Sequence, residues 1–371
     1  MPLPTSISAV TADVSTAAVT TGRCYYWLAQ LMRWKNAYGT MALGVFLALA
    51  AANLAVYKYL ARPAAVASTA GAEAEAGARR VVIAAALNYG LTRFAHFVVP
   101  LRKVYSGDIV VFVGSDLPPD VIDFCLTHRV QLMALPEQPG LAIEPALGRY
   151  AGYAQVCRRY EWCFATDFKD VVFQADPFAS APRDYDLVFA EEYAEVTIAS
   201  CPWNSRWISS CFGTEVLLQI GHRPIICSGT IMGTPRGFNE LESLIMQHAT
   251  QDAKSCIEMN GVDQGLVNYL YYADNLHSRD TYYVGAATAI AQPRGQGIVN
   301  TVGYMPGNVT TLDLQNKAGL VTNDDGTVAA VVHQYNRVPL LHGLAKRLSW
   351  VPPSTGLKGL KYSIIQLFSR K

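Results

Sequence analysis

The stretch Phe164-Ala-Thr-Asp-Phe-Lys-Asp-Val-Val-Phe-Gln-Ala-Asp-Pro-Phe178 decides the fold expected for this chain. The apolar residues 162–165 predict a buried strand, and Asp167 and Asp170 follow where that strand ends. Open α/β sheets bind ligands at the carboxyl ends of their strands. Two carboxylates among apolar residues are costly unless a cation neutralises them, and Mg²⁺ or Mn²⁺ would accept such oxygen ligands. The alternative is a turn in which both acids accept hydrogen bonds from backbone N–H groups.

Strands and helices alternate along the chain on both sides of this stretch. Apolar runs predict buried strands at residues 81–87, 108–114, 130–134, 161–166, 185–190, 224–235 and 327–335. Helical spacing predicts helices at residues 92–105, 118–127, 145–160 and 262–272, and a further helix that ends near residue 251. The alternation predicts an α/β fold with a mostly parallel sheet, right-handed crossovers and flanking helices.

Composition excludes some classes of protein and points to a membrane segment. The 371 residues carry a net charge of +1, which gives no electrostatic argument for a nucleic-acid partner.

Residues 36–57 contain no charged side chain, and a bilayer needs about 20 such residues as a helix. Tyr38 and Tyr57 lie near the two ends, where aromatic belts occur. We therefore expect a transmembrane signal-anchor at residues 36–60, the alternative being a buried alanine-rich core helix.

The flanks of this segment predict the layout of the whole chain. The segment is preceded by Arg23, Arg33 and Lys35, and fewer basic residues follow it closely. This small excess of basic residues on the N-terminal side favours a cytoplasmic N-terminus. The Ala/Gly/Glu-rich residues that follow are typical of a flexible stem. The expected order is a cytoplasmic tail (1–35), the anchor (36–60), a stem (61–79), a globular domain (80–345) and a C-terminal tail (346–371). The sequon Asn308-Val-Thr310 permits, but does not require, a lumenal domain.

Seven of the eight cysteines follow the expected anchor. Because seven is odd, at least one thiol stays outside intrachain disulfides in an oxidising lumen. Cys201 and Cys211 flank one loop-like segment and are the expected disulfide pair. Cys163 and Cys227 lie in apolar strand patterns, which are typical of buried small hydrophobic residues.

Beyond the stem, roughly from residue 80 to residue 337, the chain resembles the nucleotide-sugar-dependent glycosyltransferases of the GT-A fold. Four elements in the family's order carry the resemblance: Asp167-Phe-Lys-Asp-Val-Val-Phe-Gln-Ala-Asp-Pro-Phe178, Cys227-Ser-Gly-Thr-Ile-Met-Gly233, Asp263-Gln-Gly-Leu-Val-Asn268 and Val331-Val-His-Gln-Tyr335. The family commonly spaces its two acids as Asp-any-Asp, whereas here they are Asp-any-any-Asp. Asp170 aligns best with the second acid, which leaves Asp167 as a partner of the ribose or the metal.

The resemblance implies transfer of a sugar from a nucleoside-diphosphate sugar to a glycan or glycoconjugate acceptor. A divalent cation, Mn²⁺ or Mg²⁺, would bridge the two phosphates and neutralise the leaving group. Asp167 and Asp170 would hold this cation and His333 would complete the set, unless His333 is a core histidine bonded to backbone. The implied location is the Golgi or another endomembrane, with a single-pass type II anchor and a lumenal catalytic domain.

Several residues are expected to contact the donor. Asn88 and Tyr89, in the first turn after a strand, should lie against the nucleotide, with Tyr89 stacking on the base. Arg93 reaches a phosphate or is a solvated helix charge. Ser228 and Gly229 let the backbone approach the donor sugar, or they form an ordinary strand bulge.

Asp263 is the acid expected nearest the reacting sugar, with its neighbour Gln264 contacting the donor. It would act as the base of an inverting enzyme or stabilise the cationic centre of a retaining one. It could also bind sugar hydroxyls, or be an ordinary acid at a helix N-terminus. Glu191 and Glu192 compete for the base role because they end a strand that faces the same cleft. The sequence leaves the stereochemistry open.

Two other functions are compatible with the pattern. One is a catalytically inactive, anchored sugar-binding protein of the same fold, for which loss of the acids would be the mark. The other is a metal-dependent phosphohydrolase, which would normally place a nucleophilic aspartate directly after the first strand. Leu87-Asn88-Tyr89 offers no such residue.

Overall fold

The computed structural model describes residues 79–135, 145–251, 256, 259–278, 285–303 and 314–350. All of them belong to one compact unit, Ala74–Lys371. The expected cytoplasmic tail, anchor, sequon and nearly all of the stem lie outside the described residues. In the described part of the chain, no helix is both long and apolar enough to cross a membrane.

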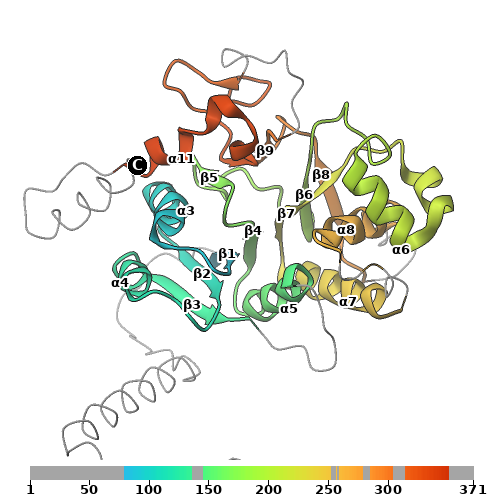
Figure 1. The fold of residues 1–371 in the computed structure, drawn as a ribbon, viewed down its shortest axis with the longest axis horizontal. Coiled ribbons are helices and arrows are strands. Elements are labelled where there is room, and N and C mark those ends of the chain that lie inside the picture. The colour runs from blue at the N-terminus through green and yellow to red at the C-terminus, as the bar shows by residue number, and fades with distance from the viewer. Residues whose placement is uncertain are drawn as a thin grey trace, which may run out of the picture. The chain divides into compact units, whose positions relative to one another are not determined.

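Seven strands of the described residues form one sheet, in the order β3-β2-β1-β4-β7-β6-β8 (Figure 1). Strands β1 to β4 pair in parallel, β8 is parallel to β6, and β7 is antiparallel to both of its neighbours. The mostly parallel α/β fold expected from the sequence is confirmed, with β7 as the antiparallel strand. The bounds are β1 (Arg80–Ala86), β2 (Asp108–Val113), β3 (Val130–Ala134), β4 (Trp162–Thr166), β6 (Leu187–Glu191), β7 (Ile226–Gly233) and β8 (Ala289–Gln292).

Helices cover both faces of this sheet (Figure 1). Val81 and Ile83 of β1 pack with α5, α7 and α8, whereas Val82 and Ala84 pack with α3 and α4 on the opposite face. Successive side chains of a strand point to opposite faces, so a sheet covered on both sides needs apolar residues at every position. The helices are α3 (Leu91–Val104), α4 (Pro119–Thr127), α5 (Pro145–Cys157), α7 (Pro235–Gln251) and α8 (Val262–Tyr272).

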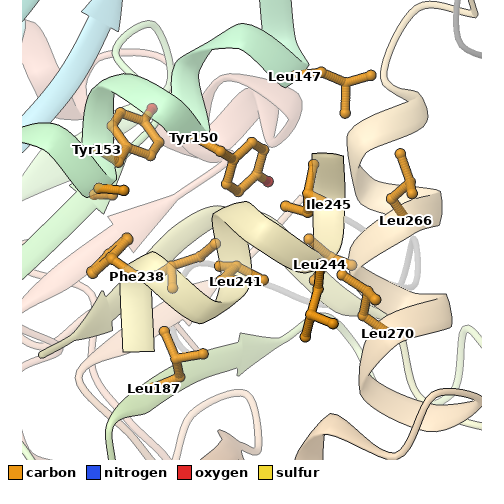
Figure 2. Packing of buried hydrophobic residues seen from close by; sticks show 14 of the residues in the cluster. Leu147, Tyr150, Tyr153, Leu187, Phe238, Leu241, Leu244, Ile245, Leu266 and Leu270 are labelled. Carbon is orange, nitrogen blue, oxygen red and sulfur yellow. The ribbon is translucent and has the colours of Figure 1, made fainter. Parts of the chain in front are cut away.

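The hydrophobic cluster on the α5 side of the sheet contains side chains of α5, α7 and α8. Two of these helices, α5 and α8, also carry residues of the candidate functional site. In Figure 2, Tyr150 and Tyr153 of α5 lie above α7, and Leu266 and Leu270 of α8 lie beside it. Tyr153 packs edge-on against Phe238 of α7, with ring centroids 6.5 Å apart. Burial of each such side chain contributes about 1.5–3 kcal/mol. This packing fixes α5 and α8 relative to each other.

A second, smaller sheet lies on the α3 side of the first. In the described residues it consists of β5 (Val171–Phe173), β10 (Val331–His333) and β9 (Val299–Thr301), with β10 in the middle. β10 is antiparallel to β5 and places His333 opposite Val171. The strand expected over residues 327–335 is therefore shorter than predicted, and β5, β8 and β9 were not predicted. The remaining short elements are η1 (Leu276–Ser278), η2 (Tyr335–Arg337), η3 (Pro339–Leu341) and α11 (Leu344–Leu348).

The cysteine expectations are partly wrong. Cys211 is joined to Cys256 and Cys157 to Cys163, both in the described part of the chain. The segment expected as a loop is helix α6 (Pro202–Ile220), which begins directly after Cys201. Ten helical residues span about 15 Å, more than twice the Cα separation that a disulfide allows, so Cys201 cannot reach Cys211. Cys163 is buried as expected but is disulfide-bonded.

Candidate functional site

A cavity of about 830 Å³ opens at the carboxyl ends of β1 and β4. Its walls come from the end of β1, the acidic turn after β4, and α5, α6, β7 and α8. This is the edge at which α/β sheets bind ligands, and the volume is in the range of small-molecule sites.

Asp167, Asp170 and His333 converge at this cavity and are called the metal trio below. One ligand atom from each lies within 4.8 Å of the others. His333 Nε2 is 3.3 Å from Asp167 Oδ2 and 3.8 Å from Asp170 Oδ1. The β10–β5 pairing creates this contact, since the backbone N–H of Gln334 donates to the carbonyl of Asp170 at 2.8 Å. The metal trio could hold a metal ion.

The surroundings of His333 favour a ligand role for its Nε2. The opposite ring nitrogen, Nδ1, lies 3.3 Å from Cys227 Sγ on β7. Metal-binding imidazoles are commonly oriented by a contact at their other nitrogen. At Gly229, an added Cβ would clash with Asp167 Oδ2 and lie 2.6 Å from His333 Cε1. The glycine therefore makes room for the metal trio itself.

Charge in the metal trio is arranged for a cation. Burial would raise the pKa of Asp167, but Arg149 and His333 hold it well below its usual range. Burial raises the pKa of Asp170, and the charge of Asp167 adds to the effect. Burial would lower the pKa of His333, but Cys227 and the two acids raise it well above its usual value. A divalent metal bound to His333 would compete with a proton for its ring nitrogen, because a metal-binding imidazole is neutral.

The donor set matches a hard or borderline divalent cation. Carboxylate oxygens suit Mg²⁺ and Mn²⁺, and a neutral imidazole favours a transition metal over Mg²⁺. Asp167, Asp170 and His333 therefore fit Mn²⁺ better than Mg²⁺.

Arg149 of α5 connects the metal trio to Asp263. Its guanidinium donates to Asp167 Oδ1 at 2.5 Å, to Asp263 Oδ2 at 2.7 Å and to the carbonyl of Ser228 at 3.3 Å. The side chains of Asp263 and Arg149 are 4% and 11% exposed, so this ion pair is buried. Arg149 was not predicted to have a role in the site. In the sequence, the only feature that could have pointed to Arg149 was a cation next to Tyr150 within an otherwise apolar stretch of helix. A cation on a helix is usually exposed to solvent.

Asp263, Gln264 and Ser228 line the cavity, as expected for contacts to a donor or a sugar. Glu192, in contrast, is buried and is not part of the cavity lining among the described residues. It accepts hydrogen bonds from Gln264 Nε2 at 3.3 Å and Gln334 Nε2 at 2.9 Å, and burial raises its pKa. The strand bulge is also present, because the β6–β7 register shifts between Phe189↔Ile231 and Ala190↔Cys227.

The turn after β1 forms the other wall of the site. Asn88 takes a left-handed conformation with φ 62°, which asparagine tolerates better than most residues. Tyr89 stacks on Phe168 of the acidic turn, with centroids 5.8 Å apart, and lines both the large cavity and a neighbouring one of about 270 Å³. Arg93 lies beside Tyr335 and is absent from both linings in the described residues. Lys169 and Arg337, which were not predicted, do line the large cavity.

No protein-family model matches the chain, and no curated protein matches it significantly. The class of protein is therefore defined by the fold and the site: an α/β protein with a mostly parallel sheet and a candidate Asp-Asp-His metal centre at its carboxyl edge.

Proposed function

We propose that the protein is a metal-dependent glycosyltransferase of the GT-A type. It transfers a sugar from a nucleoside-diphosphate sugar to a glycan or glycoconjugate acceptor. The observation that carries the proposal is the convergence of Asp167, Asp170 and His333 at a cavity on the carboxyl edge of the sheet. Residues far apart in the sequence meet where such an enzyme needs its cation.

The residues around the metal trio suit a nucleoside diphosphate. The bound cation would supply the Lewis acid that neutralises the leaving diphosphate. Lys169 and Arg337 line the cavity and add positive charge for the phosphates. Tyr89, supported from behind by Phe168, offers a flat face for the base.

Asp263 is the group proposed to act on the sugar. It lines the cavity, and the 2.7 Å contact with Arg149 orients its carboxyl group. A fixed carboxylate there can accept the proton of an acceptor hydroxyl or stabilise positive charge at the anomeric carbon. The buried Glu192 instead positions Gln264.

The proposed setting is a lumenal one. The disulfides Cys157–Cys163 and Cys211–Cys256 fit an oxidising compartment. With the uncharged run at residues 36–57, they support a type II protein of the Golgi or another endomembrane, whose catalytic domain faces the lumen.

The second candidate function is that of an inactive sugar-binding protein. It differs from the proposed enzyme only in that it does not turn over its bound sugar ligand. The presence of Asp167, Asp170 and Asp263 favours the enzyme, because loss of the acids would mark an inactive protein.

The test is release of nucleoside diphosphate by the full-length protein, supplied with UDP-sugars or GDP-sugars and Mn²⁺, with and without saccharide acceptors. We expect slow donor hydrolysis that is abolished by a chelator and accelerated by the correct acceptor. Metal-dependent binding without release would favour the inactive protein, and neither binding nor release would overturn both candidates.

A further inference from the structure

Trp203 and Trp207 of α6 line the large cavity and form what is called the aromatic platform below. Their ring centroids are 6.3 Å apart, with 33° between the ring planes. Trp203 is 57% exposed, although a tryptophan gains most from burial. An exposed indole in a cavity wall is an unused apolar contact surface.

Within the platform, the indole of Trp207 is held in place by its protein contacts. Trp207 Nε1 donates to the backbone carbonyl of Asn260 at 3.1 Å. Its ring packs on Gly261 and its Cβ on Gly265, where an added Cβ would lie only 2.7 Å from these Trp207 atoms. Gly261 also has φ +78°, which favours glycine. A surface held in this way loses little conformational entropy on binding.

The platform and Asp263 line the same cavity, and Trp207 contacts the start of the helix that carries Asp263. Gly261 and Gly265, which contact Trp207, bracket Asp263 at the start of α8. Asp263 in turn contacts Arg149, and Arg149 contacts Asp167 of the metal trio. Arg149 therefore stands between Asp263 and the metal trio in this series of contacts, and a molecule on the platform would share the cavity with Asp263.

The chemistry of this end of the cavity matches a sugar ring. A pyranose has a flat face of C–H groups and a rim of hydroxyls, which suits an indole face bordered by amides. Asn204 and Gln264 supply the amide groups in the cavity lining. A nucleobase could also stack on an indole, but its diphosphate needs the cation, and Tyr89, Lys169 and Arg337 lie with the metal trio.

We propose that the aromatic platform binds a pyranose ring of a saccharide acceptor, with Trp203 as the stacking surface. This inference rests on the proposed function and assigns a substrate class to the end of the cavity that the donor leaves open.

The test compares full-length wild type with Trp203→Ala, Trp203→Phe and Trp350→Ala. Trp350 is 53% exposed and is absent from the cavity lining, so it is the matched control. The probes are the methyl glycosides of glucose, galactose, mannose and xylose, measured by saturation-transfer NMR in a detergent without a sugar headgroup. A parallel titration with UDP or GDP and Mn²⁺ reports on the donor side.

We expect Trp203→Ala to weaken binding of at least one glycoside about tenfold, which corresponds to about 1.4 kcal/mol. Trp203→Phe should retain most of the affinity and Trp350→Ala all of it. The inference is overturned if no glycoside binds wild type at millimolar concentrations, or if Trp203→Ala binds glycosides normally. It is also overturned if Trp203→Ala weakens only UDP or GDP binding. Because glycoside binding needs no donor, a failed nucleotide titration would contradict the proposed function separately.

Discussion

Arg149 is the residue on which the charges of the site depend. It neutralises Asp167 and Asp263, and the side chain of Arg149 is only 11% exposed. Removal of one partner from a buried ion pair typically costs about 3–5 kcal/mol, because a charge is left without compensation. We expect Arg149→Ala to lower the free energy of unfolding by about that amount in urea denaturation. Arg159→Ala, an exposed change just after α5, should alter it by less than about 0.5 kcal/mol. Equal effects of the two changes would show that the ion pairs do not stabilise the fold.

Asp170→Asn tests the metal trio directly. The turn should stay folded, because the hydrogen bond from Gln334 goes to the backbone carbonyl of Asp170 and not to its side chain. We expect Mn²⁺-dependent binding of UDP or GDP to weaken by more than about tenfold in calorimetric titration, since an anionic ligand of the cation is lost. Asp123→Asn, on the exposed side of α4, is the control. Normal Mn²⁺ dependence in the Asp170 variant would refute the assignment.

Asp263→Asn and Glu192→Gln separate the two candidate acids. Asp263 lines the cavity, so its neutralisation should reduce turnover by at least about 10²-fold, as loss of a general base or a positioned charge does. Glu192→Gln keeps the shape of a buried side chain and should affect turnover far less. Kcat values for both variants provide the comparison. If only the Glu192 variant is inactive, the two roles must be exchanged.

Helix α6 is tied to the chain before α8 by Cys211–Cys256. This disulfide closes a loop of 45 residues, for which chain entropy gives about 4 kcal/mol of stabilisation. We expect the double variant Cys211→Ala/Cys256→Ala to lose about 2–4 kcal/mol in chemical denaturation. Cys125→Ala removes a buried thiol of α4 and should cost about 1 kcal/mol. A double variant as stable as this control would mean that α6 is held by packing alone.

Asp186 joins three elements next to β6 and predicts a pH dependence of stability. It accepts hydrogen bonds from Thr234 and Thr288 and pairs with Arg236. Burial opposes ionisation, but these partners lower its pKa to about 2. The folded pKa lies below the unfolded value of about 3.9, so the contribution is complete above about pH 4 and is lost as the pH falls toward 2.

The expected size of this Asp186 contribution is about 1–2 kcal/mol. Urea denaturation between about pH 5 and pH 2 should show Asp186→Asn to be less stable than wild type at the upper end and to have a shallower slope. Parallel curves for the two proteins would contradict the assigned pKa.

At the scale of the whole molecule, the uncharged run at residues 36–57 predicts membrane attachment. A polypeptide that starts at Ala74, where the compact unit begins, should remain in the supernatant after high-speed centrifugation. The full-length protein should require detergent, because about 20 apolar residues span a bilayer as a helix. Uncleaved full-length protein in a detergent-free supernatant would rule the anchor out.

The sequence patterns predicted the central sheet well because each signal is local. Strands β1, β2 and β4 appear as largely continuous apolar runs, as strands covered on both faces do, whereas the edge strand β3 contains the exposed Gln131. Helix α6 was missed because its apolar residues do not form one stripe, and Trp203 and Leu218 are exposed. β5 and β9 have three residues each, too short for a periodic pattern.

The sequence by itself determined the alternation of strands and helices and the position of Asp167 and Asp170 after a buried strand. Only the tertiary structure decided that Arg149 bridges Asp167 and Asp263, and that Cys227 supports His333. The contacts Arg149–Asp263 and Cys227–His333 join residues 114 and 106 positions apart. Periodicity along a chain reports which side of an element is buried, whereas contacts between elements depend on sheet order and helix packing, which no local pattern records.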